Sequence, residues 1–225
     1  PALPTPTGQP TELVYERRSS VITNPDGSIV FKMEGAEIPS TWSQLATDIV
    51  ISKYFRKAGL HGDAKKGEKS VREVVYRIAH TIRDAADKFG GYFATKADAD
   101  AFEAELSFLM VNQCGAFNSP VWFNCGLWAE YGITGSGGNW AAAVPGLSTH
   151  GHNTHVNGSK KAGPQPTQVF ETKNAYERPQ CSACFIQASS DDLMGIYELV
   201  KSEARLFKYG SGTGSNFSSI RGRQE

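Results

Sequence analysis

The stretch from residue 184 to residue 220 constrains the fold of this chain more than any other. Cys184–Ala188 is a short apolar run of the kind that forms a buried strand, and Asp191 and Asp192 then occupy positions that suit a helix N-cap. Apolar residues follow at helical spacing, and Asn216–Ile220 is expected to form a second strand. A strand, a helix and a strand in this order predict a βαβ unit with parallel strands.

The first half of the chain is predicted to be mainly helical, after a β-hairpin at residues 17–31. The hairpin turn is Asn24–Gly27, where Pro and Gly suit a reversal of the backbone. The clearest helix starts with a capping box formed by Ser70 and Glu73, and its apolar side chains recur at helical spacing as far as Phe89. Further helices are expected at residues 43–57 and 96–112.

The composition changes between Tyr131 and Pro179, where Gly, Ser, Asn and Pro are frequent and no helical or strand period survives. Loops of this length are usually functional or disordered, so we expect part of it to be mobile. Its histidines, at positions 150, 152 and 155, have no rigid scaffold, which favours a solvated loop over a metal site.

Composition excludes several classes of protein. Lys plus Arg and Asp plus Glu number 23 each, so the chain has no general electrostatic attraction to nucleic acid. No apolar run is long enough for a membrane helix, and Pro1–Pro10 lacks the pattern of a secretory signal, which predicts a cytoplasmic protein. Four cysteines are too few for a disulfide framework. The chain stops directly after the second expected strand, so we expect a fragment of a longer protein.

Cys181 and Cys184 form a C-x-x-C motif with three possible interpretations. A structural zinc site needs four ligands, and Cys114 and Cys125 are not paired in a way that would supply two more. A thioredoxin-type pair precedes a helix, whereas here a strand is expected to begin at the second cysteine. Taken alone, the motif favours one or two buried cysteines that act as small hydrophobic residues.

Two further segments could contribute to a binding site. The run Gly210–Gly214 lacks the Lys of a Walker loop and is a poor match to the dinucleotide fingerprint. Its backbone amides could still approach an anion closely, although a plain tight turn is equally compatible. Asn118–Asn124 places small polar groups beside two aromatic residues, which suits either the edge of a binding site or a helix terminator followed by a core strand.

Taken together and in order, these pieces resemble the large catalytic subunit of ribonucleotide reductases. The resemblance rests on residues 118–126, 179–186, 191–192, 208–214 and 220–221. Residues 42–56, together with 117–124, are similar to the N-terminal region of the adenosylcobalamin-dependent branch.

The resemblance implies an α/β fold, α+β overall, in which a helical N-terminal domain precedes a ten-stranded α/β barrel. We expect a disordered segment at 1–16 and a mainly helical domain with a hairpin at 17–117, and the resemblance implies that the start of the barrel occupies 118–225. The long flexible loop at about 131–179 falls inside this last part.

The resemblance also assigns roles by position. Cys184 matches the reducing cysteine that forms a disulfide during turnover. Ser119, Ala183, Ser211 and Gly212 fall where the family binds the substrate ribose and phosphates, partly through backbone amides. Asp192 and Arg221 fall where a deoxynucleotide effector is held. The resemblance implies adenosylcobalamin as the cofactor. The partners that it implies are a ribonucleoside di- or triphosphate substrate, a deoxynucleotide effector, a thioredoxin-like reductant and a second copy of the chain.

Part of the family's active site has no match here. The C-x-E pattern of the radical-forming cysteine does not occur, so we expect this polypeptide alone to be inactive. The alternative from another class is a self-contained nucleotide-binding or regulatory module that uses the glycine run without redox chemistry.

Overall fold

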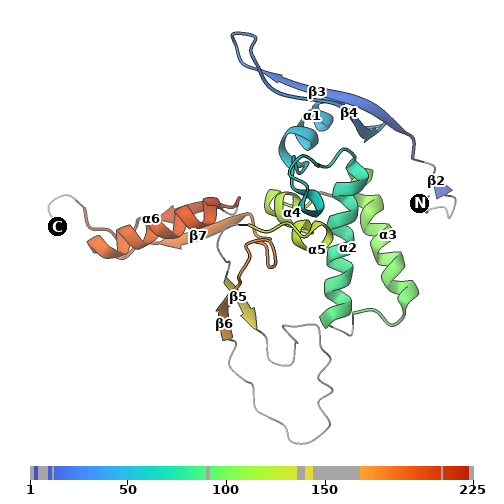
Figure 1. The fold of residues 1–225 in the computed structure, drawn as a ribbon. Coiled ribbons are helices and arrows are strands. Elements are labelled where there is room, and N and C mark those ends of the chain that lie inside the picture. Colours follow the sequence, from blue (N-terminus) through green and yellow to red (C-terminus); the bar gives the residue numbers. More distant parts are fainter. Residues whose placement is uncertain are drawn as a thin grey trace, which may run out of the picture. The chain divides into compact units, whose positions relative to one another are not determined.

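The computed structural model describes residues 3–4, 10–11, 13–89, 92–135, 140–143, 168–208 and 210–222 (Figure 1). The chain forms two compact units, and each is described by itself. Unit 1 comprises Pro1–Ala116 and Gly126–Arg178, and unit 2 comprises Phe117–Cys125 and Pro179–Glu225. No helix in the described ranges is long and apolar enough to cross a membrane.

Unit 1 contains a long antiparallel hairpin of β3 (Tyr15–Thr23) and β4 (Ile29–Pro39) (Figure 1). Its turn is the predicted one, with Gly27 at a φ of 83°. The strands run further than the predicted 17–31, because the ladder continues through a bulge opposite Ser19, where Gly35 has a φ of 69°. The expected disorder of residues 1–16 is therefore wrong for Tyr15 and for Glu16, which pair with β4.

Two other strand pairs belong to unit 1, both antiparallel. They are β1 (Leu3–Pro4) with β2 (Pro10–Thr11), and β5 (Trp140–Ala143) with β6 (Gln168–Glu171). The second pair and the buried residues Thr172, Asn174 and Ala175 lie within the expected 131–179 loop, so that range was too wide. The predicted mobility, and the three histidines, otherwise lie outside the described residues.

The helices described in unit 1 are α1 (Gln44–Ile49), a π-helical turn η1 (Val50–Tyr54), a short 3-10 turn η2 (Leu60–Gly62), α2 (Val71–Phe89), α3 (Lys96–Val111) and α5 (Leu127–Tyr131). Local side chains cap three of them, namely α1, α2 and α3. Thr95 and Asp98 form a full capping box on α3. At α2 the Glu73 carboxylate accepts from the Ser70 amide as predicted, whereas the Ser70 hydroxyl accepts from the amide of Arg72.

The core of unit 1 surrounds one face of α2, where Val71, Val74 and Ile78 are fully buried. The same face carries Arg77, whose Nε lies 2.8 Å from the Glu68 carboxylate, with both side chains fully buried. The Tyr131 hydroxyl donates to the same carboxylate at 2.9 Å. Burial and the negative charge of Glu68 raise the pKa of Tyr131 well above its ordinary value, so this hydroxyl stays protonated as a donor.

Unit 2 contains the predicted βαβ unit. Strand β7 (Cys184–Ala188) is followed by α6 (Leu193–Lys208) and by β8 (Gly212–Asn216), which pairs with β7 in parallel (Figure 1). The second strand begins four residues before the predicted 216–220. Gly210, at a φ of 82°, ends the helix with amide bonds back to its last turn, so the glycine run passes directly into the strand.

The remaining element of unit 2 is α4 (Ser119–Asn124). The structure therefore contradicts a core strand after Asn118. Pro120 lies in the first turn of this helix, where a missing N–H costs nothing, and Pro120, Val121 and Trp122 are buried.

Candidate functional site

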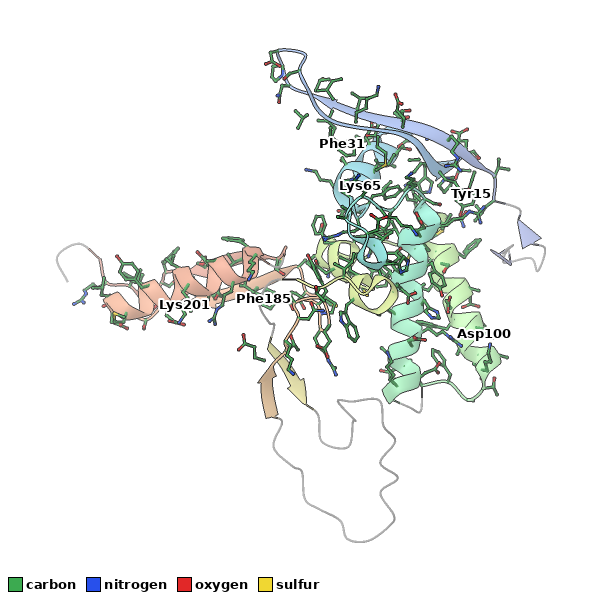
Figure 2. All side chains as sticks on the ribbon, viewed as in Figure 1. Tyr15, Phe31, Lys65, Asp100, Phe185 and Lys201 are labelled. Atoms are coloured by element: carbon green, nitrogen blue, oxygen red, sulfur yellow. The ribbon has the colours of Figure 1, made fainter. Side chains whose placement is uncertain are left out.

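Cys184 lies on an open face of the parallel pair. The other face contacts α6, because the Ser215 hydroxyl donates to Glu203 of that helix. On this same face the Gln187 side chain donates to the Thr213 hydroxyl at 2.8 Å, from one strand to the other. Side chains alternate along a strand, so Cys184 and Ile186 point the opposite way, and Ile186 is 85% exposed. Phe185, labelled in Figure 2, belongs to the α6 face and is half-buried.

The expected burial of this strand is therefore wrong. Parallel strands are usually covered on both faces, but the described residues of unit 2 supply a covering helix on one face only. Cys184 is accordingly exposed, and its thiol is not in a disulfide.

Glycines line β8 beside the thiol. Cys184 pairs with Gly212, and a Cβ built on Gly212 would lie 4.0 Å from the Cys184 sulfur. A Cβ on Gly214 would lie 3.2 Å from the Ile186 side chain, on the same face. The backbone next to the sulfur is thus uncovered by side chains, which leaves room for a small molecule to approach the thiol.

Three successive carbonyls before Cys184 accept hydrogen bonds from other parts of unit 2. The Asn118 side-chain amide donates to the Cys181 carbonyl at 2.8 Å. The Ser211 hydroxyl donates to the Ser182 carbonyl at 2.6 Å, and the Gly212 amide donates to the Ala183 carbonyl. The irregular segment that leads into β7 is therefore held by donors from two separate parts of unit 2.

These bonds alter the expected use of the glycine run. Ser211 is 5% exposed, its hydroxyl is bound to Ser182, and its amide donates to the Leu206 carbonyl at 3.0 Å. The Gly212 amide is also satisfied internally. The run Gly210–Gly214 is therefore neither a plain tight turn nor an open phosphate-binding loop, because it forms the end of α6 and the start of β8. The amides of Ser211 and Gly212 donate to backbone carbonyls and do not point to solvent in this structure.

The predicted site residues form two groups at opposite ends of the strand pair. Ser119, Ala183, Cys184, Ser211 and Gly212 gather at the start of β7 and β8, with Ser119 placed there by its neighbour Asn118. Asp192 and Arg221 follow the far ends of the same strands. Four residue steps along a strand span about 13 Å.

The expected effector residues are held in a small polar network. Asp192 caps α6 by accepting from the Gly195 amide at 2.8 Å, and it also accepts from the Ser190 hydroxyl. Those two hydrogen bonds, that of Ser190 first, lower the pKa of Asp192. Arg221 pairs with Asp191 at 3.2 Å instead of with Asp192.

Sequence reasoning missed the roles of Asn118 and Asp191. The contact from Asn118 to Cys181 spans 63 residues, and no local pattern signals it. Cys181, the other cysteine of the motif, is exposed, yet neighbouring atoms desolvate its thiol and raise the pKa of Cys181. No cluster of metal-ligating side chains is present in the parts of the chain that the structure describes.

The chain resembles known proteins along most of its length. A family profile described as class II vitamin B12-dependent ribonucleotide reductase matches residues 16–113, and one described as the ribonucleotide reductase barrel domain matches residues 182–225. The vitamin B12-dependent ribonucleotide reductase of Rhodopirellula baltica is 41% identical over 216 residues, which cover 94% of this chain and 18% of that protein.

Two further relatives carry the same name. That of Bradyrhizobium diazoefficiens is 39% identical over 94% of this chain and 18% of its own length. That of Streptomyces clavuligerus is 36% identical over 95% of this chain and 17% of its own length. The chain thus spans about 18% of the length of the curated relatives it matches. The resemblance predicted from the sequence is confirmed: the chain is similar to class II vitamin B12-dependent ribonucleotide reductases at residues 16–113 and to the ribonucleotide reductase barrel domain at residues 182–225.

Proposed function

We propose that this chain supplies one wall of the substrate site in a protein that reduces ribonucleotides to deoxyribonucleotides. In the overall step the 2′-hydroxyl of the ribose leaves as water, and two thiols become one disulfide. The two thiols provide the two electrons and two protons that the reduction requires. Cys184 is one of these thiols, and the second comes from outside the matched residues.

The observation that carries the proposal is the position of Cys184. Cys184 is the first residue of β7. Its thiol lies beside a glycine-lined stretch of backbone and is accessible. A reducing thiol must reach the sugar while its backbone is held, because small misplacements of reacting groups lower rates strongly. The bonds to the three preceding carbonyls provide that support.

The open face of β7 has a consequence for the complete protein. We propose that further strands and helices of an α/β barrel cover it, so that Cys184 comes to face an enclosed site. Ser119 and Ala183 would then border the substrate ribose, while Ser211 and Gly212 would shape the site through their backbone. Removal of water would strengthen every polar contact with the nucleotide.

We propose adenosylcobalamin as the cofactor of the complete protein, where it would generate the radical that starts the reaction. Neither histidine in the described residues is placed as a free cobalt ligand. His80 bonds Glu103 at 3.0 Å, and the His61 ring packs against Tyr131, so both described histidines are engaged elsewhere. This chain's own contribution is therefore to bind and orient the substrate and to present a reducing thiol.

The far end of the strand pair suits a deoxynucleotide effector. Arg221 can pair a phosphate, and the carboxylates of Asp191 and Asp192 can accept from a ribose hydroxyl. From the family resemblance we also propose that the complete protein uses a thioredoxin-like reductant, pairs with a second copy of itself and is cytoplasmic.

The experiment compares Cys184→Ser with wild type in the full-length protein that carries this chain. Cys114→Ser is the matched control, because Cys114 is also an exposed thiol but lies in unit 1. We expect Cys184→Ser to abolish turnover with a dithiol while nucleotide binding is retained, and Cys114→Ser to change neither. Wild-type turnover in Cys184→Ser would show that Cys184 is not a reducing thiol, and would leave this chain a nucleotide-binding role without redox chemistry of its own.

A further inference from the structure

Asn118 stands at the N-cap position of α4 but does not cap it. Asparagine at this position usually accepts from an amide in the first turn, and here no side-chain capping bond is made. The side chain is instead directed across unit 2, where it donates to the Cys181 carbonyl at 2.8 Å. A residue type that suits local capping is thus used for a contact with the chain that leads to Cys184.

The backbone around Asn118 is itself anchored. The Trp122 indole donates to the Phe117 carbonyl at 2.9 Å, and Trp122 is 7% exposed. The backbone that carries the Asn118 side-chain donor is therefore held in place. A donor of this kind limits how far the Cys181 carbonyl can move.

The contact lies three residues before the proposed reducing thiol. Between Cys181 and Cys184 the chain is not part of a helix or strand. Its position depends on the bonds to its three carbonyls: Ser211 and Gly212 supply two of the donors, and Asn118 supplies the third from a separate segment of the chain. Loss of the Asn118 donor leaves the Cys181 carbonyl without this hydrogen bond and loosens the start of the segment.

We propose that Asn118 is a positioning residue for ribonucleotide reduction, which fixes the Cys184 thiol through the Cys181 carbonyl. This inference rests on the proposed function and deepens it, since Asn118 does not touch the thiol itself. A shift of about 1 Å at a reacting group can lower a rate by about 100-fold, so a single hydrogen bond three residues away is sufficient to matter.

The test uses Asn118→Ser and Asn118→Ala in the full-length protein. Serine is neutral and caps helices as well as asparagine does, but its hydroxyl is one atom too short to replace the amide donor. Alanine removes the donor and offers no side-chain group that could cap the helix. Asn112→Ser is the matched control, because the Asn112 amide also bonds a backbone carbonyl, that of Phe108 at 2.9 Å, at the end of α3 in unit 1.

A positioning role predicts that Asn118→Ser and Asn118→Ala lower kcat alike, by about tenfold or more, while KM for the nucleotide stays within about twofold. The thermal midpoint should stay close to that of Asn112→Ser, which should keep wild-type turnover. Wild-type kcat in Asn118→Ser would overturn the proposal, and with a low kcat in Asn118→Ala it would assign Asn118 to helix capping. A fall in kcat that only follows lost stability would also overturn it.

The Cys184→Ser variant, measured in parallel, separates the positioning role of Asn118 from the reducing role of Cys184. Its inactivity combined with normal turnover in Asn118→Ser would reject the positioning role alone. Its full activity would reject the proposed function from which the positioning role follows.

Discussion

Cys184 and Gly212 lie directly opposite each other in the parallel ladder, and a Cβ atom at position 212 would lie 4.0 Å from the cysteine sulfur. The missing side chain is thus what keeps the thiol accessible on its own sheet face. A substitution at this position tests the geometry without removing the sulfur.

Gly212→Val should slow alkylation of Cys184 several-fold, because two methyl groups would stand beside the sulfur while the strand backbone suits a β-branched residue. Alkylation of individual cysteines is followed by peptide mass spectrometry. Thr213→Val, on the α6 face, is the control and should leave the Cys184 rate unchanged. Equal rates in wild type and Gly212→Val would show that the two residues are not neighbours.

Arg77→Met should lower the free energy of unfolding by about 3–5 kcal/mol, because it leaves the Glu68 carboxylate buried without its partner. Thermal or urea unfolding of the chain measures this loss. Lys96→Ala removes an exposed pair with Asp100 in the same unit and should cost less than about 1 kcal/mol. Similar losses in both variants would argue against the buried pair.

Gly126→Ala should destabilise unit 1 much more than Gly132→Ala, although both glycines have positive φ, 82° and 66°. A Cβ on Gly126 would lie 2.3 Å from the Arg77 carbonyl oxygen, whereas nothing lies within 4 Å of a Cβ on Gly132. Gly132→Ala should therefore cost only the left-handed strain, about 1–2 kcal/mol. Comparison of the two unfolding curves decides whether Gly126 is needed for close packing.

The raised pKa of His80 predicts that the stability of the folded chain depends on pH. Burial alone would lower its pKa, but the hydrogen bond to Glu103 and the nearby charges of Asp84 and Glu130 outweigh it, so the pKa of His80 is raised. Stability from the charged ring is fully present below the unfolded pKa, about 6.5, and is lost as pH rises through the folded value. His80→Gln should remove this decline from unfolding curves measured between about pH 5 and pH 8. An identical decline in the variant would assign it to another group.

The sequence was most informative where the signals are local. The helix expected at 96–112 was found at Lys96–Val111, because its cap and its apolar spacing lie within the segment itself. Arg77 could have been predicted as buried, since it shares a helical face with Val74 and Ile78. Its charge is tolerated there because Glu68, which lies before the helix, is buried with it.

Non-local features could not be predicted in this way. The start of β8 depends on pairing with β7, and its glycines give no strand signal of their own. The exposure of Cys184 depends on which elements cover the sheet, and the bond from Asn118 to Cys181 joins segments 63 residues apart. The predicted site residues were brought together at two ends of one strand pair, but their roles stay predictions.

The most direct measurement follows the Cys184 thiol through one turnover. The full-length protein is reduced, freed of dithiol, and given ribonucleotide and adenosylcobalamin; remaining thiols are then alkylated and mapped by mass spectrometry. We expect Cys184 to become disulfide-bonded in proportion to the deoxynucleotide formed. Deoxynucleotide formation with Cys184 still fully open to alkylation would contradict the account.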